Sequence, residues 1–157
     1  MTPSDGVPEP LLRTARIDDL PELLRLAREF YDEDGFTTSD ADLERNFRAL
    51  LGDEDNAYVC LATVDGACVG FALTTNRMIL ESGNVAELQD LYVMPAYRRH
   101  GIGDVLIDDA VEWAAEHQAS MVEVVVAPND RDVSRLVAYY ERLGFRDEGR
   151  LTLALDL

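Results

Sequence analysis

Two arginines and two glycines stand just before a helical stretch of this chain, and their spacing could bind a phosphate. They lie in the run Arg98-Arg99-His100-Gly101-Ile102-Gly103. The first N–H groups of a helix have no partner inside it and carry a partial positive charge. Glycines leave these donors open to a ligand, and arginines add charge-assisted hydrogen bonds. The run therefore predicts a phosphate or pyrophosphate site, although a plain glycine-containing turn with solvated arginines fits the same residues equally well.

Two common phosphate-binding loops can be tested against this run. A P-loop ends in Gly-Lys-Ser/Thr, and this chain contains no lysine. A dinucleotide-binding fingerprint needs a third glycine three positions after the second, and that position is Leu106 here. The pattern that remains is Arg-x-x-Gly-x-Gly after an apolar strand.

The elements around the run support a strand, a turn and a helix. Residues 85–93 are predicted as a strand that ends before Pro95, because proline has no N–H to donate to a sheet. After Gly101, apolar residues recur at helical spacing as far as His117-Gln118. In this order, the first N–H groups of the helix point toward any ligand that binds at the turn.

The rest of the chain predicts a mixed α+β order. Strands are expected at 11–17, 57–64, 67–75, 85–93, 121–127, 145–148 and 150–155, and helices at 19–34, 38–51, 102–118 and 132–143. Asp65-Gly66 joins the second and third strands as a hairpin, and 76–84 is expected to be a connection. Residues 1–10 are predicted as a flexible lead-in, followed by a single domain over 11–157.

Two motifs in this order resemble those of a known family. The run from Arg98 to Gly103 resembles the coenzyme A pyrophosphate loop of the GCN5-related N-acetyltransferases. The stretch Val137–Phe145 resembles that family's later motif, a helix that ends in Tyr-Glu-x-Leu-Gly-Phe. The resemblance covers residues 11–157 and implies the acyl-CoA N-acyltransferase fold, with a mixed, mostly antiparallel sheet of about seven strands flanked by four helices. The chain departs from the motif at Val133, where many members of the family have asparagine.

The resemblance implies acetyl-CoA as the acyl donor. Backbone N–H groups from Arg99 to Asp104 would hold its pyrophosphate. The end of the strand before the loop would pair with the pantetheine arm as an added strand, and an N–H near Val93 would face the thioester carbonyl. The predicted cofactor-binding residues are Leu91, Tyr92, Val93, Arg98, Arg99, His100, Gly101, Ile102, Gly103, Asp104 and Tyr140.

Tyr140 is the predicted acid that protonates the leaving thiolate. Its helical spacing with Val133, Leu136 and Val137 turns it inward, whereas Tyr139 is expected to face outward. A phenol with a pKa of about 10 is neutral at pH 7 and can donate its proton. The residue pattern alone favours a core tyrosine, and it is the family motif that favours the catalytic role.

Two carboxylates are candidates for the base that deprotonates the acceptor amine. Glu87 lies where histone-type members of the family place a glutamate base. Alternation along the strand places Asp90 on the opposite face, where many small-molecule members carry an acid beside the substrate. One of the two carboxylates, or a chain of water molecules, would take the proton. Either residue could equally be a solvated carboxylate of the strand.

Charge and cysteine content restrict the partners and the compartment. The net charge of −17 repels nucleic acids and anionic membranes. No apolar run approaches the roughly 20 residues that span a bilayer. In the predicted hairpin, Cys60 faces Phe71 and Cys68 faces Thr63, so no disulfide is expected. These features, with no targeting segment at the start, predict a cytoplasmic protein.

The predicted function is the transfer of the acetyl group of acetyl-CoA to a primary amine, by general acid/base catalysis in a ternary complex. Residues 29–55 are rich in acidic side chains with Tyr31, Phe36 and Phe47 interleaved, which suggests a cationic acceptor. A chain that is acidic throughout would show the same excess. A catalytically inactive, acetyl-CoA-binding sensor and an interaction module without a ligand are the alternatives. Whether the protein forms a homodimer is left open.

Overall fold

A computed structural model describes residue 6 and residues 8–157. The chain divides into two compact units, one up to Val125 and the other from Val126 to Leu157. Within the described residues, no helix is both long and apolar enough to cross a membrane.

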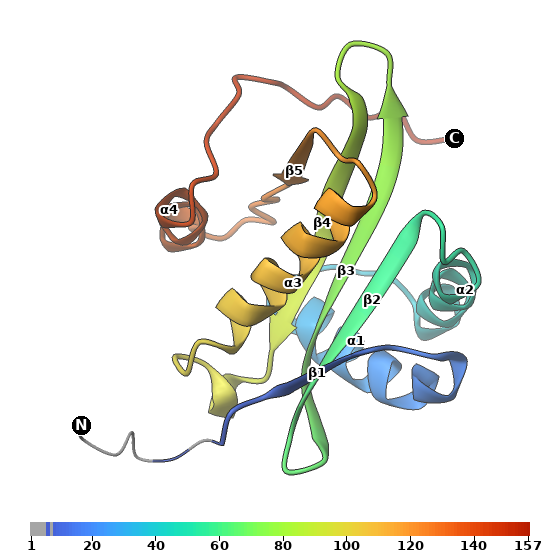
Figure 1. Ribbon diagram of the computed structural model, residues 1–157, viewed down its shortest axis with the longest axis vertical. Coiled ribbons are helices and arrows are strands. Elements are labelled where there is room, and N and C mark those ends of the chain that lie inside the picture. Colours follow the sequence, from blue (N-terminus) through green and yellow to red (C-terminus); the bar gives the residue numbers. More distant parts are fainter. Residues whose placement is uncertain (1–5, 7) are drawn as a thin grey trace. The chain divides into compact units, whose positions relative to one another are not determined.

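The first unit is built on a five-stranded sheet in the order β1-β2-β3-β4-β5 (Figure 1). The strands are β1 (Leu11–Thr14), β2 (Ala57–Val64), β3 (Ala67–Ile79), β4 (Gly83–Val93) and β5 (Met121–Val124). The first four strands pair antiparallel, and β5 runs parallel to β4. A parallel neighbour needs a crossover connection, and the helix after β4 supplies it.

Helices cover both faces of this sheet. They are α1 (Leu20–Asp34), α2 (Asp40–Leu51) and α3 (Ile102–Glu116), with short 3₁₀ turns at Ile17–Asp19 and Pro95–Tyr97. Buried side chains of α1 and α2 pack with Val59, Leu61, Phe71, Leu73 and Tyr92 of the sheet. The other face packs on α3, where Trp113 and Ala114 contact Ala86 (Figure 1). The predicted α+β class is confirmed.

Local signals set the ends of the first two helices. Leu20, Leu23, Leu26 and Ala27 form the buried stripe of α1, which ends at Gly35 with a φ of 78°. The Ser39 hydroxyl accepts a hydrogen bond from the Asp42 N–H at 3.1 Å and so begins α2. These starts and ends agree with the sequence-based prediction.

Two parts of the predicted hairpin region are wrong. Residues 76–84 are not a loose connection, because β3 and β4 continue to a tight turn where Ile79 pairs with Gly83. Cys68 pairs with Thr63 as predicted, but Cys60 pairs with Ala72, since an irregularity between Ala62 and Thr63 shifts the register. Both cysteines are free.

The second unit contains one helix, α4 (Ser134–Arg142), which is followed by Gly144 with a φ of 97°. The strands predicted at 145–148 and 150–155 are wrong, because the structure shows no strand in 126–157, and β5 ends at Val124. Leu151, Leu153 and Leu155 are largely exposed. Alternating apolar residues form a strand only when a neighbouring strand takes their backbone hydrogen bonds. The sheet therefore has five strands and not about seven.

Candidate active site

An extra residue in β4 sets the geometry of the candidate site. Leu73 of β3 pairs with Asp90, and the next residue, Thr74, pairs with Leu88, so Gln89 is a β-bulge. Thr75 pairs with Glu87. Because alternate residues of β3 share a face, their partners Glu87 and Asp90 lie on the same face of the sheet. The expectation that these two carboxylates face opposite sides is wrong.

Sequence reasoning missed the bulge, although a signal for it is present. Leu88 and Leu91 pair with Thr74 and Ala72, so both leucines lie on the face that packs on α3. They are three positions apart, whereas a regular strand repeats a face every two positions. An apolar spacing of three inside a strand indicates one inserted residue.

Asp90 is a partly buried carboxylate with one hydrogen-bond donor. The Tyr31 hydroxyl, from α1, donates to Asp90 Oδ1 at 3.1 Å. Burial, together with the charges of Glu87 and Asp34, raises the pKa of Asp90 to about 6, while the hydrogen bond from Tyr31 lowers it. A carboxylate that titrates near neutral pH is suited to accept a proton from a substrate.

A series of aromatic contacts extends from Tyr31, the hydrogen-bond partner of Asp90. The ring of Tyr31 lies 4.9 Å from that of Phe36 and 5.4 Å from that of Phe30. Phe30 in turn makes an edge contact with Tyr92, whose hydroxyl donates to Glu29 at 3.4 Å. Such a combination of ring faces and negative charge attracts ammonium groups.

The predicted phosphate loop has the backbone of an exposed turn that leads into a helix. Arg99 has a φ of 66° and Gly101 a φ of 79°, and α3 begins at Ile102. The first bond of the helix runs from the Val105 N–H to the Gly101 carbonyl at 3.1 Å. The N–H groups of the residues between them have no carbonyl within the helix to bind. Arg99, His100, Gly101 and Asp104 are exposed, Gly103 is partly buried, and Ile102 is buried.

Arg98 joins the loop to α1. Its two Nη atoms donate to the two carboxylate oxygens of Glu33, each at 2.7 Å, and its Nε donates to the Val93 carbonyl at 2.8 Å. The guanidinium also lies 5.5 Å from the centre of the Tyr92 ring. In this structure Arg98 holds the start of the loop against α1 and the end of β4.

One edge of β4 is unpaired beyond the bulge. The pairing with β5 ends at Leu88 and Val124, and no strand within 8–125 pairs with that edge of Leu91–Val93. On its other edge this segment pairs with β3, where Gly70 lies opposite Val93. A Cβ atom at Gly70 would lie 2.6 Å from the Tyr92 carbonyl oxygen, so this close approach requires glycine.

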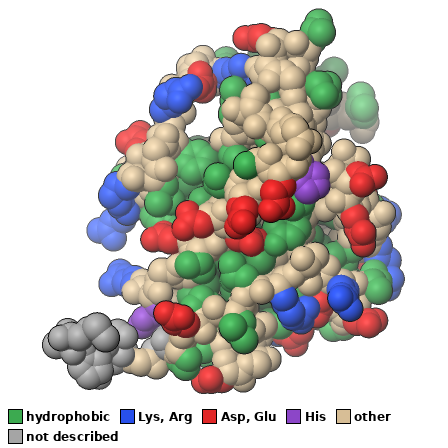
Figure 2. Space-filling model, viewed as in Figure 1, with side chains coloured by type: hydrophobic (Ala, Val, Ile, Leu, Met, Phe, Trp, Pro, Cys, Tyr) green, Lys and Arg blue, Asp and Glu red, His purple; other side chains and the backbone are tan. Residues whose placement is uncertain are grey.

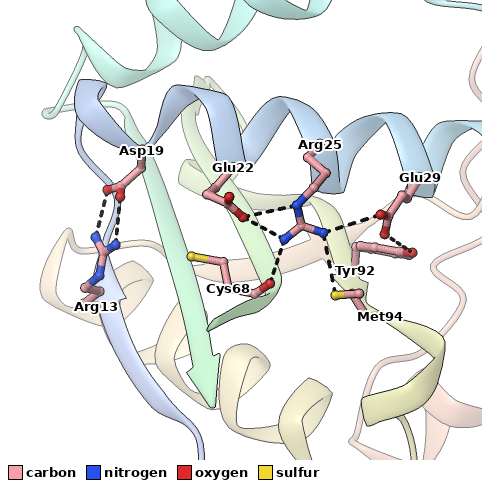
Figure 3. A network of polar contacts seen from close by, with 8 residues as sticks. All are labelled: Arg13, Asp19, Glu22, Arg25, Glu29, Cys68, Tyr92 and Met94. Atoms are coloured by element: carbon pink, nitrogen blue, oxygen red, sulfur yellow. Dashed lines mark hydrogen bonds and ion pairs between the residues drawn. The ribbon is translucent and has the colours of Figure 1, made fainter. Parts of the chain in front are cut away.

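A polar network fixes α1 against the strand ends near the site (Figure 3). Arg25 of α1 forms ion pairs with Glu22 and Glu29 of its own helix, at 2.7 and 3.4 Å. It also donates to the Cys68 carbonyl at 2.9 Å and contacts the Met94 sulfur at 3.8 Å. The helix that carries Tyr31 is therefore tied to the first residues of β3 and to the residue after β4.

Tyr140 lies in the second unit and is the buried residue of α4, as its helical spacing predicts. Its ring lies 5.4 Å from the rings of Tyr139 and Phe145, and its carbonyl accepts the Phe145 N–H at 3.1 Å. These contacts lie within the second unit and do not test the role of Tyr140 as the acid, which stays a prediction.

Comparison with known proteins agrees with the two motifs. The sequence model of the acetyltransferase (GNAT) family matches residues 20–145. An uncharacterized N-acetyltransferase of Archaeoglobus fulgidus is 35% identical over 131 residues, which are 81% of this chain and 88% of that protein. A thialysine N-epsilon-acetyltransferase of Sus scrofa is 28% identical over 146 residues, 87% of this chain and 84% of the relative.

A solved structure shows the same fold. It is that of a predicted acetyltransferase with acetyl-CoA from Clostridium acetobutylicum, which aligns with a TM-score of 0.77 at 20% identity. The alignment covers 93% of this chain and 96% of the other. On the family match and the similarity to the archaeal relative, this chain belongs to the acetyltransferase (GNAT) family.

Proposed function

We propose that this protein transfers the acetyl group of acetyl-CoA to the primary amine of a cationic acceptor, with Asp90 as the base. The observation that carries the proposal is the bulge at Gln89. It turns Asp90 and Glu87 to one face of β4, next to the unpaired edge of Leu91–Val93 and close in sequence to the exposed loop. A base, an edge for an extended arm and a phosphate-binding turn thus come from one continuous segment.

The chain offers a fitting site for the diphosphate of acetyl-CoA. An ideal Cβ atom added at Gly101 would meet no atom within 4 Å, so space stands open above the turn. Arg99 is exposed beside that space. The N–H groups of a helix start, an exposed guanidinium and an open turn are what a diphosphate needs. When bound, acetyl-CoA supplies an activated acyl group as a thioester.

In the proposed reaction, Asp90 takes a proton from the acceptor ammonium, directly or through water. The free amine nitrogen then attacks the carbonyl carbon, whose oxygen the Val93 N–H would stabilise. The carbon–sulfur bond breaks as the predicted acid Tyr140 donates a proton to the thiolate, and the nitrogen gives its second proton to the resulting phenolate, directly or through water. The chain's own groups thus accept two protons and donate one, the proton left on Asp90 passes to solvent, and the neutral amide and free coenzyme A leave.

The wall beside Asp90 supports a cationic acceptor. Tyr31 and Phe36 present aromatic rings there, and Glu87 and Asp34 add negative charge to that of Asp90. The relative from Sus scrofa is named for an acceptor nitrogen in an amino compound, thialysine. An anionic acceptor would be repelled by this wall, and an uncharged acceptor would gain no charge attraction from it.

Release of free thiol from acetyl-CoA in the presence of an amine panel tests the proposal. We expect turnover with diamines and aminoglycoside-like bases, and little with neutral or acidic acceptors. Asp90→Asn should lower kcat by about 10²–10⁴-fold because the amide accepts no proton, while calorimetry shows unchanged acetyl-CoA binding. Glu87→Gln is the matched comparison: it should keep most of kcat, because Asp90 remains the base, but raise KM for a cationic acceptor, because the wall loses a negative charge.

Other outcomes of the same experiment have clear meanings. Tight acetyl-CoA binding with no thiol release for any amine would favour the sensor alternative. If Asp90→Asn kept full turnover and Glu87→Gln lost it, the assignment of the base would be wrong. Preference for acidic acceptors would contradict the cationic acceptor.

A further inference from the structure

Tyr31 connects the helical cover of the site to the bulged strand. It lies near the end of α1, and its hydroxyl reaches Asp90 Oδ1 on β4 at 3.1 Å. Contacts with Phe30 and Phe36 hold its ring on two sides. The ring therefore has little freedom, and the direction of its O–H bond toward the carboxylate is set by packing.

Within 8–157, Tyr31 is the one side chain whose hydrogen bond to Asp90 the structure shows. Since Gln89 is the bulged residue, Asp90 needs an anchor outside the regular strand to keep one orientation. A carboxylate that lies partly buried without a donor is costly and turns toward water.

We propose that Tyr31 is a positioning residue for Asp90, whose carboxylate it holds toward the acceptor amine and keeps able to accept a proton. The inference rests on the proposed function in one respect, namely that Asp90 is the base. The proposal adds a residue of α1 to the catalytic site. The position of this helix then affects the pKa and the orientation of the Asp90 carboxylate.

The charges around Asp90 make this link measurable. From α1 it faces Tyr31 and Asp34, and from its own strand it faces Glu87. Its partner on β3 is the apolar Leu73. On the neighbouring strand β5, Glu123 lies opposite Glu87 and forms an ion pair with Arg77. The described neighbours of Asp90 are thus negative or uncharged, and Tyr31 alone among them favours its ionised form by a hydrogen bond.

Two substitutions should therefore move the titration of Asp90 in opposite directions. Tyr31→Phe removes the donor but keeps the ring and its packing, so the charged form loses support and the pKa rises. Glu87→Gln removes a nearby negative charge, so the pKa falls. A purely structural role for Tyr31 would not produce a shift of fixed sign.

Carbon-13 NMR titration of the aspartate carboxyls in the free protein is the test, with the Asp90 signal identified by its loss in Asp90→Asn. We expect the midpoint to rise by at least about 0.5 pH unit in Tyr31→Phe and to fall in Glu87→Gln. The control is Tyr58→Phe, which removes another tyrosine–aspartate bond, to Asp109 at 2.6 Å. Its Asp90 midpoint should stay unchanged.

In the pH profile of kcat/KM for an amine that the enzyme acetylates, the low-pH side (the acid limb) should shift in the same direction as the Asp90 midpoint of each variant. An Asp90 midpoint that does not move in Tyr31→Phe, or that falls, overturns the inference even if the enzyme acetylates amines. Shifted midpoints with no amine acetylated under any condition support the coupling of the two residues and overturn the proposed function. Shifted midpoints with a fixed acid limb overturn the role of Asp90 as the base that Tyr31 positions.

Discussion

At the scale of single residues, the environment separates two carboxylates of similar type. Glu87 and Asp90 share one face of β4, and Asp90 accepts a hydrogen bond from the Tyr31 hydroxyl and has a pKa raised by burial to about 6. Since protonation removes the accepting form, catalysis by Asp90 should be present above that pH and should fade as the pH falls through it. The raised pKa of Asp90 comes from burial, and its hydrogen bond comes from a distant part of the chain. The residue type alone predicts neither.

Gly101 offers a second test at this scale. Its φ of 79° is strained for any residue with a Cβ atom, and the space above it is open. Gly101→Ala should cost about 1 kcal/mol of unfolding free energy, and its methyl group would occupy the room proposed for the diphosphate. We expect acetyl-CoA affinity, measured by calorimetry, to fall at least tenfold.

Gly66→Ala is the matched control for that substitution. Gly66 has a φ of 81°, equally open surroundings and a place in the β2–β3 turn. The two variants should lose similar stability in thermal unfolding, but Gly66→Ala should bind acetyl-CoA like the wild type. Equal affinities in both variants would contradict the assignment of the loop.

At the scale of the elements, α3 begins at the predicted phosphate loop and carries a charge pattern along its length. Asp104, Asp108, Glu112 and Glu116 are exposed at intervals of four residues. Figure 2 shows acidic side chains in a row along this helix. Like charges at this spacing repel one another, and those beyond the first turn gain nothing from the helix dipole. The stability of α3 therefore comes from its buried face, which includes Leu106, Ala110 and Trp113.

Reversing one charge in this row should stabilise the protein. Glu112→Arg replaces two repulsive neighbours by two attractive ones, to Asp108 and Glu116, each worth about 0.2–0.5 kcal/mol. Removal of the two repulsions and gain of the two attractions should together raise the unfolding free energy, measured by urea titration, by roughly 1–2 kcal/mol. Glu112→Gln removes the repulsion only and should give about half the gain. A loss of stability in both variants would show that the row makes favourable contacts.

At the scale of the whole molecule, the net charge of −17 dominates the long-range energy. Self-repulsion of this size opposes the compact state, and dissolved salt screens it. The Debye length falls from about 30 Å at 0.01 M to about 3 Å at 1 M ionic strength. We therefore expect added salt to stabilise the molecule by screening alone, without a specific ion site.

The midpoint of thermal unfolding should rise by several degrees between 0.01 M and 0.5 M sodium chloride, measured by circular dichroism. Screening of many surface charges is the reason, so potassium chloride should give the same rise. A midpoint that falls with added salt would mean that favourable ion pairs, such as those of Arg25 and Arg98, outweigh the general repulsion.

The sequence alone determined whatever depends on neighbours along the chain. The hairpin turn at Asp65-Gly66, the cap at Ser39 and the start of α3 after Gly101 follow from local backbone preferences, and the structure has all three. The Arg98–Gly103 run and the Val137–Phe145 stretch together also indicated the family, because each motif is made of consecutive residues. Local rules were sufficient wherever the interacting atoms lie within about one helical turn or one β-turn.

Only the tertiary structure decided what depends on pairing between distant segments. The bulge at Gln89 arises from the register of β3 against β4, and it reverses the expected face of Asp90 relative to Glu87. The bond from Tyr31 to Asp90 spans 59 positions of sequence, and no spacing rule reaches that far. The prediction of two final strands was wrong for the same reason. An alternating apolar pattern indicates which residues would share a face, but a strand forms only where another strand pairs with its backbone.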